Sequence, residues 1–338
     1  MRRRLIKQGH DTLTITLPKS WITRQKLNKG DEIIITESGG NLILTSDNKT
    51  DGVKRIVIDV TNLTNPLIWK YFMAVYRAGY DEIKFVFPHS KKLYEVTLSS
   101  TRILEKKTNQ IGSPIKLSII EILQDMAHRF IGMEIIEQKE TYCVVRDVSE
   151  PSEKEFENSI RRIFTLLLGM AEDNIELLKK RDDKMRSNID VSDINIDRFT
   201  DYCLRILNKN YYKKAGSDTT SFYSIILLLE FIGDEYRKIA FHGSSLKKTN
   251  KLLIELSKKT LELLELFYDF FYKFDDKKAI QIHQKERKLH DELSRADLKL
   301  TKEEQEVNFH LKKIKRFIID LILLRIEQEV SKPPHVSL

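Results

Sequence analysis

The pattern of hydrophobic and polar positions changes along the chain. Near the N-terminus, residues 12–17 (TLTITL) alternate polar and apolar side chains. Alternation with a period of two is typical of a half-buried β-strand. From Ser152 onward, apolar positions recur every three or four residues, which is the period of an amphipathic helix. The pattern predicts a β-rich N-terminal region and a large all-helical C-terminal region.

The first region, residues 1–48, predicts four short strands and one short helix. Pro18 ends the second strand and opens a helix over residues 19–26, because proline fits the first helical turn. Gly39-Gly40 predicts a tight hairpin between the last two strands. The strands are expected at residues 2–7, 12–17, 32–37 and 41–46. A unit this small has little apolar surface to bury, so we expect it to interlock with a second copy.

Residues 53–148 predict a compact α+β module. Its expected elements are a strand at 53–60, a helix at 65–79, a strand at 83–87, a helix at 117–131 and a hairpin over 133–148. The sequence contains neither a glycine-rich phosphate loop nor a nucleophile elbow. It therefore predicts no catalytic chemistry in this module.

Residues 152–332 predict an all-α bundle, because helices joined by short connections pack as antiparallel neighbours. Six helices are expected, at roughly 152–180, 191–210, 217–242, 246–273, 275–298 and 301–331. The segment Glu230-Phe-Ile-Gly-Asp234 is echoed 86 residues later by Arg316-Phe-Ile-Ile-Asp320. This faint repeat divides the six helices into two sets of three.

The positive charge is concentrated at one end of the chain. Residues 1–30 hold eight lysines and arginines but a single acid, Asp11, so they carry +7 of the net charge of +8. A basic end on a nearly neutral body is typical of a module that contacts nucleic acid. A basic arm that only aids solubility is the alternative.

Other features of the composition place the protein in the cytoplasm. The longest apolar run, Ser221 to Gly233, is shorter than the roughly 20 residues that cross a bilayer, and Glu230 interrupts it. The three opening arginines are not followed by the apolar stretch of a secretory signal. The two cysteines, Cys143 and Cys203, are expected to be buried thiols in a reducing compartment.

The N-terminal region resembles a known family. The string RLIKQGHDTLTITLPKSWITRQKLNKGDEIII is similar to the swapped-hairpin (SpoVT-AbrB) domain of the AbrB and MazE group, at that family's spacing. The resemblance implies that two chains exchange hairpins to form one dimeric β-barrel that lies on double-stranded DNA. It places Arg3, Arg4 and Lys7 at DNA-facing positions, with Arg2 and Lys19 as phosphate contacts. A domain that serves only for dimerisation is the alternative.

The helical region resembles a second family. The string LLEFIGDEYRKIA is close to the signature of PhoU, a cytosolic regulator of phosphate uptake, around its E-x-x-x-D motif. The phrases YRAGYDEI and FIGMEIIEQ are similar to the linking region of archaeal AbrB–PhoU fusions. Together the resemblances imply a multidomain α+β protein: half of a swapped-hairpin barrel, an α+β linking module, and a PhoU-like bundle of two three-helix repeats.

Four carboxylates of the bundle are candidate metal ligands. Glu230 and Asp234 lie one helical turn apart, and Asp193 and Asp197 have the same spacing on another helix. Such an oxygen-rich site suits iron, manganese or magnesium, and the PhoU resemblance implies metal at these motifs. An ordinary solvated carboxylate face is the alternative.

The second half of the bundle departs from this motif. Arg316 replaces the expected glutamate, and Glu286-x-x-x-His290 replaces a paired-acid motif. The simplest account is that Arg316 pairs with Asp320 across one helical turn.

Three functional hypotheses are compatible with these features. The leading one is a homodimeric, DNA-binding transcriptional regulator of phosphate homeostasis, which is not an enzyme. The second is a dimeric adaptor that binds a phosphate transporter or a sensor kinase and never contacts DNA. The third is a carboxylate-bridged metalloenzyme, which the chain disfavours because it lacks a full set of inward Glu and Glu-x-x-His ligands.

Overall fold

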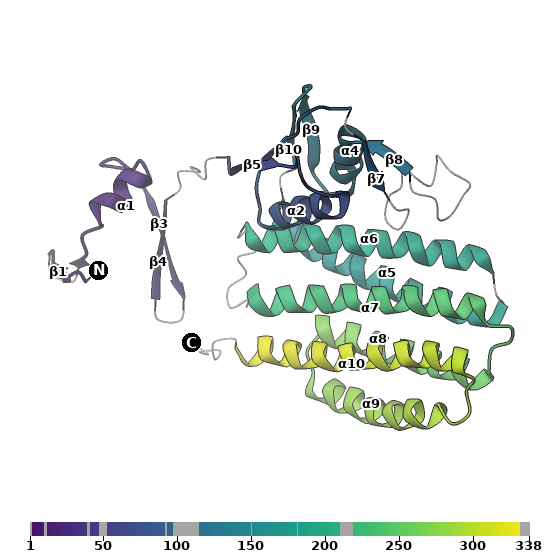
Figure 1. Cartoon of the computed structure of the whole chain (residues 1–338). Coiled ribbons are helices and arrows are strands. Elements are labelled where there is room, and N and C mark those ends of the chain that lie inside the picture. The colour runs from purple at the N-terminus through teal and green to yellow at the C-terminus, as the bar shows by residue number, and fades with distance from the viewer. Residues whose placement is uncertain are drawn as a thin grey trace. The chain divides into compact units, whose positions relative to one another are not determined.

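The computed structural model of the chain describes residues 2–9, 12–38, 41–46, 53–91, 93–96, 115–149, 151–180, 182–209 and 219–331. The chain divides into two compact units, Met1–Lys54 and Arg55–Leu338. The first unit contains short strands and one short helix, and the second contains an α+β module and a helical bundle (Figure 1).

The N-terminal unit consists of two separate strand pairs and a helix. Strand β1 (Ile6–Lys7) pairs antiparallel with β2 (Leu13–Thr14), and helix α1 (Lys19–Arg24) follows Pro18 as predicted. Strands β3 (Ile33–Ser38) and β4 (Asn41–Ser46) form the predicted hairpin, with Ser38 opposite Asn41. The expected turn at Gly39-Gly40 lies outside the described residues. Because the described strands of this unit form two separate two-stranded sheets, the swapped barrel remains a prediction about a pair of chains.

The α+β module is built on a four-stranded sheet in the order β5-β6-β10-β9. Strand β5 runs parallel to β6, as the predicted strand–helix–strand unit requires, and the hairpin of β9 and β10 completes the sheet. Its elements in chain order are β5 (Arg55–Asp59), α2 (Asn65–Arg77), β6 (Glu82–Val86), β7 (Leu93–Val96), β8 (Ile115–Ser118), α4 (Ile119–Arg129), β9 (Met133–Gln138) and β10 (Tyr142–Asp147).

Two details of this module differ from the prediction. Strands β7 and β8 form a second antiparallel pair that the pattern did not indicate. The helix predicted from residue 117 begins at Ile119, because Ser118 caps it. The Ser118 hydroxyl accepts a hydrogen bond from the backbone N–H of Glu121, and the Glu121 carboxylate accepts one from the backbone N–H of Ser118. Residues 117 and 118 therefore end β8.

All six predicted helices of the bundle are present. They are α5 (Glu153–Lys180), α6 (Asp183–Asn208), α7 (Thr219–Ser245), α8 (Lys251–Tyr272), α9 (Asp276–Ala296) and α10 (Lys302–Val330). The predicted start of the second helix at residue 191 is wrong, since α6 begins eight residues earlier. Asp182 caps it by accepting a hydrogen bond from the Lys184 backbone N–H at 2.9 Å. The exposed polar pair Ser187-Asn188 lies within this helix.

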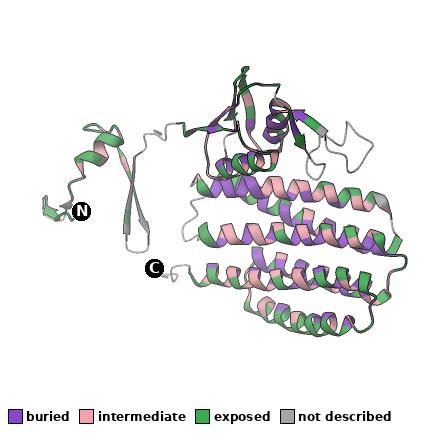
Figure 2. Cartoon of the chain, viewed as in Figure 1, coloured by how far each residue is buried: buried purple, intermediate pink, exposed green. Residues whose placement is uncertain are grey.

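The division of the bundle into two sets of three helices, α5–α7 and α8–α10, stays a prediction, because α10 packs more extensively on α7 than on α8 or α9. The sets meet mainly where α7 packs on α10 and α5 packs on α8 (Figure 1). Buried side chains run through the interior of the bundle and of the α+β module, whereas exposed residues cover their outer faces (Figure 2). Cys143 and Cys203 are buried free thiols, as expected, and burial raises the pKa of Cys143 to about 12.

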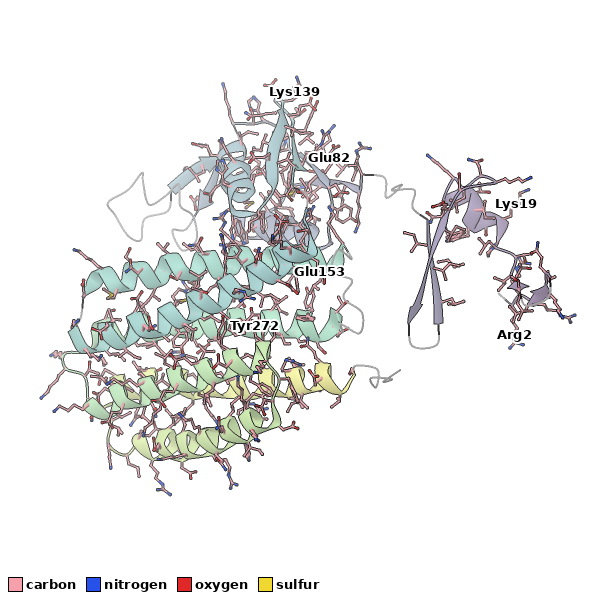
Figure 3. The ribbon with its side chains drawn as sticks, turned by 180° about the vertical axis from the view of Figure 1, so that it is seen from behind. Arg2, Lys19, Glu82, Lys139, Glu153 and Tyr272 are labelled. Atoms are coloured by element: carbon pink, nitrogen blue, oxygen red, sulfur yellow. The ribbon has the colours of Figure 1, made fainter. Side chains whose placement is uncertain are left out.

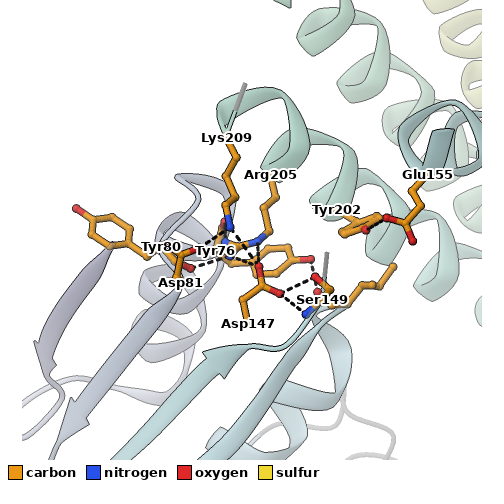
Figure 4. Close-up of polar contacts among 10 residues, drawn as sticks. Tyr76, Tyr80, Asp81, Asp147, Ser149, Glu155, Tyr202, Arg205 and Lys209 are labelled. Carbon is orange, nitrogen blue, oxygen red and sulfur yellow. Dashed lines mark hydrogen bonds and ion pairs between the residues drawn. The ribbon is translucent and has the colours of Figure 1, made fainter. Parts of the chain in front are cut away.

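A buried arginine joins the α+β module to the bundle. Arg205 projects from α6, its side chain is fully buried, and its guanidinium lies 2.6 Å from the Asp147 carboxylate at the end of β10 (Figure 4). It also donates hydrogen bonds to the backbone oxygens of Tyr76 (2.7 Å) and Tyr80 (2.8 Å). Such a charge is tolerated in an interior only when its donors are paired, so this contact fixes how the module sits on α6.

No helix within the described ranges has both the length and the apolarity that crossing a bilayer requires.

Candidate functional site

The five cations predicted to contact DNA are exposed in the N-terminal unit. They are Arg2, Arg3, Arg4, Lys7 and Lys19. Lys7 lies in β1 and Lys19 opens α1, and Figure 3 shows Arg2 and Lys19 extending from the ribbon. None of the five makes an ion pair with another described residue. Their charge is therefore available to an anionic partner.

The same unit exposes apolar side chains that a folded protein normally buries. Among residues 2–9 and 12–35 none is buried. The exposed apolar side chains include Leu5 (65%), Leu13 (60%) and Ile35 (61%). The part of this unit whose burial is described therefore has no core in a single copy, and apolar surface of this kind favours association with another chain.

The four predicted metal ligands lie on neighbouring helices of the bundle. Asp193 and Asp197 lie on α6, Glu230 and Asp234 lie on α7, and these helices pack together. Asp201 continues the series on α6 at the same spacing and is itself buried. We call these five residues the acidic cluster.

Burial and mutual repulsion shift the pKa values of the acidic cluster upward. Burial, together with the negative charges of Asp197 and Asp234, raises the pKa of Asp193 to about 7 and that of Glu230 to about 8. The pKa of Asp234 is also raised, mainly by burial. Both causes act against the ionised form of a carboxyl group, so positive charge brought to this surface is stabilising.

Arginines already neutralise part of the cluster. Arg237 of α7 places its Nε 3.1 Å from Asp193. Two further arginines come from the α+β module: Arg129 at the end of α4 lies 2.7 Å from Asp197, and Arg77 at the end of α2 lies 2.6 Å from Asp201. The cluster is thus also part of the contact between module and bundle.

The carboxylates do not form a ready metal site. Within the described residues, no three carboxylates of the cluster bring one oxygen each within 4.8 Å of one another. A cation of the predicted kinds would therefore bind here only if arginine contacts yielded or if waters completed its coordination, which magnesium readily retains.

Sequence reasoning found four members of the cluster and missed the fifth. Asp201 continues the four-residue spacing of Asp193 and Asp197, and that spacing is visible in the sequence. The partners Arg77 and Arg129 are more than 60 residues away from the carboxylates they contact. No local pattern identifies such pairs.

In the second half of the bundle, ion pairs form at the positions where the paired-acid motif is absent. Arg316 lies 3.1 Å from Asp320 one helical turn away, which confirms the expected pairing. Lys315 places its ammonium group 2.9 Å from Glu286 and 3.1 Å from the His290 ring. The Glu286-x-x-x-His290 pair therefore holds a lysine.

The acidic cluster predicts that Glu230→Gln stabilises the metal-free protein at alkaline pH. The pKa of Glu230 is raised on folding, so wild-type stability falls as pH rises from about 4.5 to about 8. The amide has no charge to lose, so the variant should be about 1–3 kcal/mol more stable near pH 8.5 and equal to wild type near pH 4.

Urea unfolding at the two pH values, with a chelator present, measures this difference. Glu255→Gln, at an exposed position on α8, is the matched control and should change stability little at either pH. A Glu230→Gln variant less stable than wild type at pH 8.5 would show that the carboxylate is favourably paired.

Comparison with known proteins shows a family to which the N-terminal unit is similar. Residues 6–51 match the family described as "Antidote-toxin recognition MazE, bacterial antitoxin". The N-terminal unit is MazE-like. This confirms the predicted AbrB/MazE resemblance of the N-terminal unit.

The chain is also structurally similar to a solved helical protein. This is the phosphate transport system regulatory protein PhoU from Streptococcus pneumoniae, with 20% sequence identity and a TM-score of 0.48. The similarity covers 53% of this chain and 96% of that protein. Among curated proteins, no sequence is a significant match.

Proposed function

We propose that this protein is a homodimeric, cytoplasmic, DNA-binding transcriptional regulator of phosphate uptake, and that it is not an enzyme. The observation that carries the DNA-binding part is the set of five exposed cations in the MazE-like unit, none of which makes an ion pair with another described residue. Cations that make no ion pair with other described residues lose no internal partner when they bind phosphates. Their binding releases the counterions condensed on the DNA, so the affinity is expected to depend on salt concentration.

Dimerisation follows from the exposed apolar surface of the MazE-like unit. Leu5, Leu13 and Ile35 are each at least 60% exposed in the single chain. A second copy that covers these side chains removes them from water and also doubles the cationic surface offered to a duplex.

The phosphate part of the proposal rests on the sequence motif of α7. The segment around Glu230 and Asp234 resembles the PhoU signature, and these carboxylates meet Asp193 and Asp197 of α6 in the acidic cluster. We further propose that iron, manganese or magnesium binds at this cluster, because a cation relieves the repulsion that raises the pKa values of Asp193 and Glu230.

Arg129 gives such a cation a way to act on the α+β module. In the structure Arg129 neutralises Asp197 and its backbone oxygen accepts a hydrogen bond from Arg198 of α6. A cation at the acidic cluster competes with Arg129 for Asp197. Binding of the cation would therefore loosen one contact between the module and the bundle. A ligand that interacts differently with the tight and the loosened arrangement can couple its site to the rest of the protein.

This competition predicts that Arg129→Gln binds Mn²⁺ more tightly than wild type does. The substitution removes the cation that holds Asp197, and we expect an affinity increase of about 5–50-fold, as the typical size of coupling between sites suggests. Manganese titration followed by electron paramagnetic resonance measures it. Arg186→Gln, an arginine of α6 that pairs with no carboxylate of the acidic cluster, is the control and should leave the affinity unchanged. Equal affinities for Arg129→Gln and wild type would contradict the competition.

Binding of the protein to its own promoter DNA at several salt concentrations tests the proposed function. We expect affinity to fall steeply as salt rises, together with a dimeric mass in solution. An absent or salt-insensitive signal favours the second hypothesis instead, an adaptor that dimerises and binds a phosphate transporter or signalling protein.

A further inference from the structure

Three side chains meet where the two halves of the bundle pack together. His242 lies near the end of α7, and Glu306 and His310 lie one turn apart near the start of α10. One potential ligand atom from each lies within 4.8 Å of the other two. This is the one group of three such donors found within the described residues, and it is separate from the acidic cluster.

A buried carboxylate orients one of the two imidazoles. Glu235 of α7 lies with its Oε2 2.5 Å from Nδ1 of His310, and both side chains are buried. If Nδ1–H donates this hydrogen bond, Nε2 of His310 is left with a free lone pair. A carboxylate behind the ligating histidine is the usual outer partner in metal sites, because it fixes the tautomer and the ring orientation.

Glu235 is itself held in place from the other side. Its Oε1 accepts hydrogen bonds from Lys238 at 2.8 Å and from Lys313 at 3.4 Å. The carboxylate is therefore bound on both oxygens, and the His310 ring has little freedom to turn. The His242 ring stacks on it, with centroids 5.3 Å apart and planes inclined by 23°.

We propose that His242, Glu306 and His310 bind a zinc ion, with Glu235 as the outer partner of His310. Two imidazoles and one carboxylate are the ligands of many zinc sites with an open fourth position, whereas magnesium and calcium prefer oxygen ligands alone. Glu306 is exposed and His242 is partly exposed, so the ion has access from solvent and a water completes its coordination.

The site joins the two three-helix sets, since α7 belongs to the first and α10 to the second. The ion thus bridges the main contact between them. Because zinc binds the folded arrangement of these three side chains, it stabilises the packing of α7 on α10.

Titration of the full-length protein with Zn²⁺ against a competing chromophoric chelator tests the proposal. We expect one tightly bound ion per chain, an increase in melting temperature, and no effect of Mg²⁺ at the same concentration. Glu235→Gln should weaken zinc binding by about 10–100-fold, the usual cost of losing an outer partner. His242→Ala and Glu306→Gln should weaken it more and should abolish the increase in melting temperature.

Two controls make the result decisive. His283→Ala removes an exposed histidine of α9 and should leave zinc binding unchanged. His242 and Glu306 are not fully buried, so circular dichroism without zinc should show both variants folded. Equal weakening by His283→Ala, or unchanged binding in His242→Ala and Glu306→Gln, would overturn the proposal and leave the stacked histidines as packing. Neither result bears on DNA binding.

Discussion

Asp147→Ala should lower the free energy of unfolding at pH 7 by about 3–5 kcal/mol, the usual cost of removing one partner from a buried ion pair. The Asp147 side chain is 3% exposed and lies 2.6 Å from the fully buried Arg205 guanidinium. The alanine variant leaves the buried Arg205 guanidinium with hydrogen bonds to the Tyr76 and Tyr80 carbonyls and with the Asp81 carboxylate, which is 3.9 Å away and partly exposed. We therefore expect the α+β module to loosen from α6, which urea unfolding and limited proteolysis measure.

The effect should depend on pH in a defined direction. Burial by itself would raise the pKa of Asp147, but the positive charge of Arg205 and hydrogen bonds from Ser149 lower the pKa below its ordinary value. The stabilisation is therefore complete above the ordinary aspartate pKa of about 3.9 and is lost as pH falls below it. The difference in the free energy of unfolding between wild type and Asp147→Ala should therefore become smaller at acidic pH.

The neighbouring residue offers a matched control. Arg146 lies on the same strand and pairs with Glu82 at 2.7 Å, but its side chain is 48% exposed. Arg146→Ala should cost less than about 1 kcal/mol, because solvent screens such a pair. If Arg146→Ala and Asp147→Ala destabilise the protein equally, burial of the Arg205 contact is not what matters.

Local patterns were sufficient to predict most elements of this fold. The three-to-four residue period identified all six helices of the bundle, and Pro18 identified the start of α1. Helix α2 ends at Arg77, close to the predicted end at residue 79, where Gly79 has a φ of +77° that glycine adopts without strain. These features depend on neighbouring residues, so the sequence carries them directly.

Contacts between distant segments were not predictable in the same way. The pairing of β7 with β8 joins segments that are about 20 residues apart, and neither strand is long enough to show a clear alternation. The sequence also gave no indication that Arg205 is buried, since its partners Asp147 and Tyr76 are 58 and 129 residues away. Charged side chains are normally expected at the surface.

The candidate sites show the same division. The four-residue spacing of acids was enough to predict two pairs of carboxylates, Asp193 with Asp197 and Glu230 with Asp234, each on one face of a helix. The spacing of Glu306 and His310 is equally regular, but only the packing of α7 on α10 brings His242 beside them. An i, i+4 pair becomes a candidate metal site when a third ligand is supplied from another helix, which a single sequence does not show.

Replacing Arg3, Arg4 and Lys7 together by alanine should weaken binding to promoter DNA on the order of 100-fold or more at moderate salt. All three side chains are exposed, and none pairs with another described residue. Each phosphate contact contributes about 0.9 to the slope of log affinity against log salt, so the slope should fall by about 3 for each protomer. Fluorescence anisotropy over a range of salt concentrations measures both quantities.

The control removes the same charge from the bundle. Lys258, Arg287 and Lys288 are exposed cations of α8 and α9 that make no ion pair with another described residue, and their replacement by alanine should leave the slope unchanged. Equal effects of the two triple variants would mean that overall charge, and not the MazE-like unit, attracts DNA. Unmeasurable binding by wild type and by both variants would favour the adaptor. Because the three N-terminal cations are exposed, lost DNA binding in a variant that remains dimeric identifies β1 and the residues before it as the surface that meets the phosphate backbone.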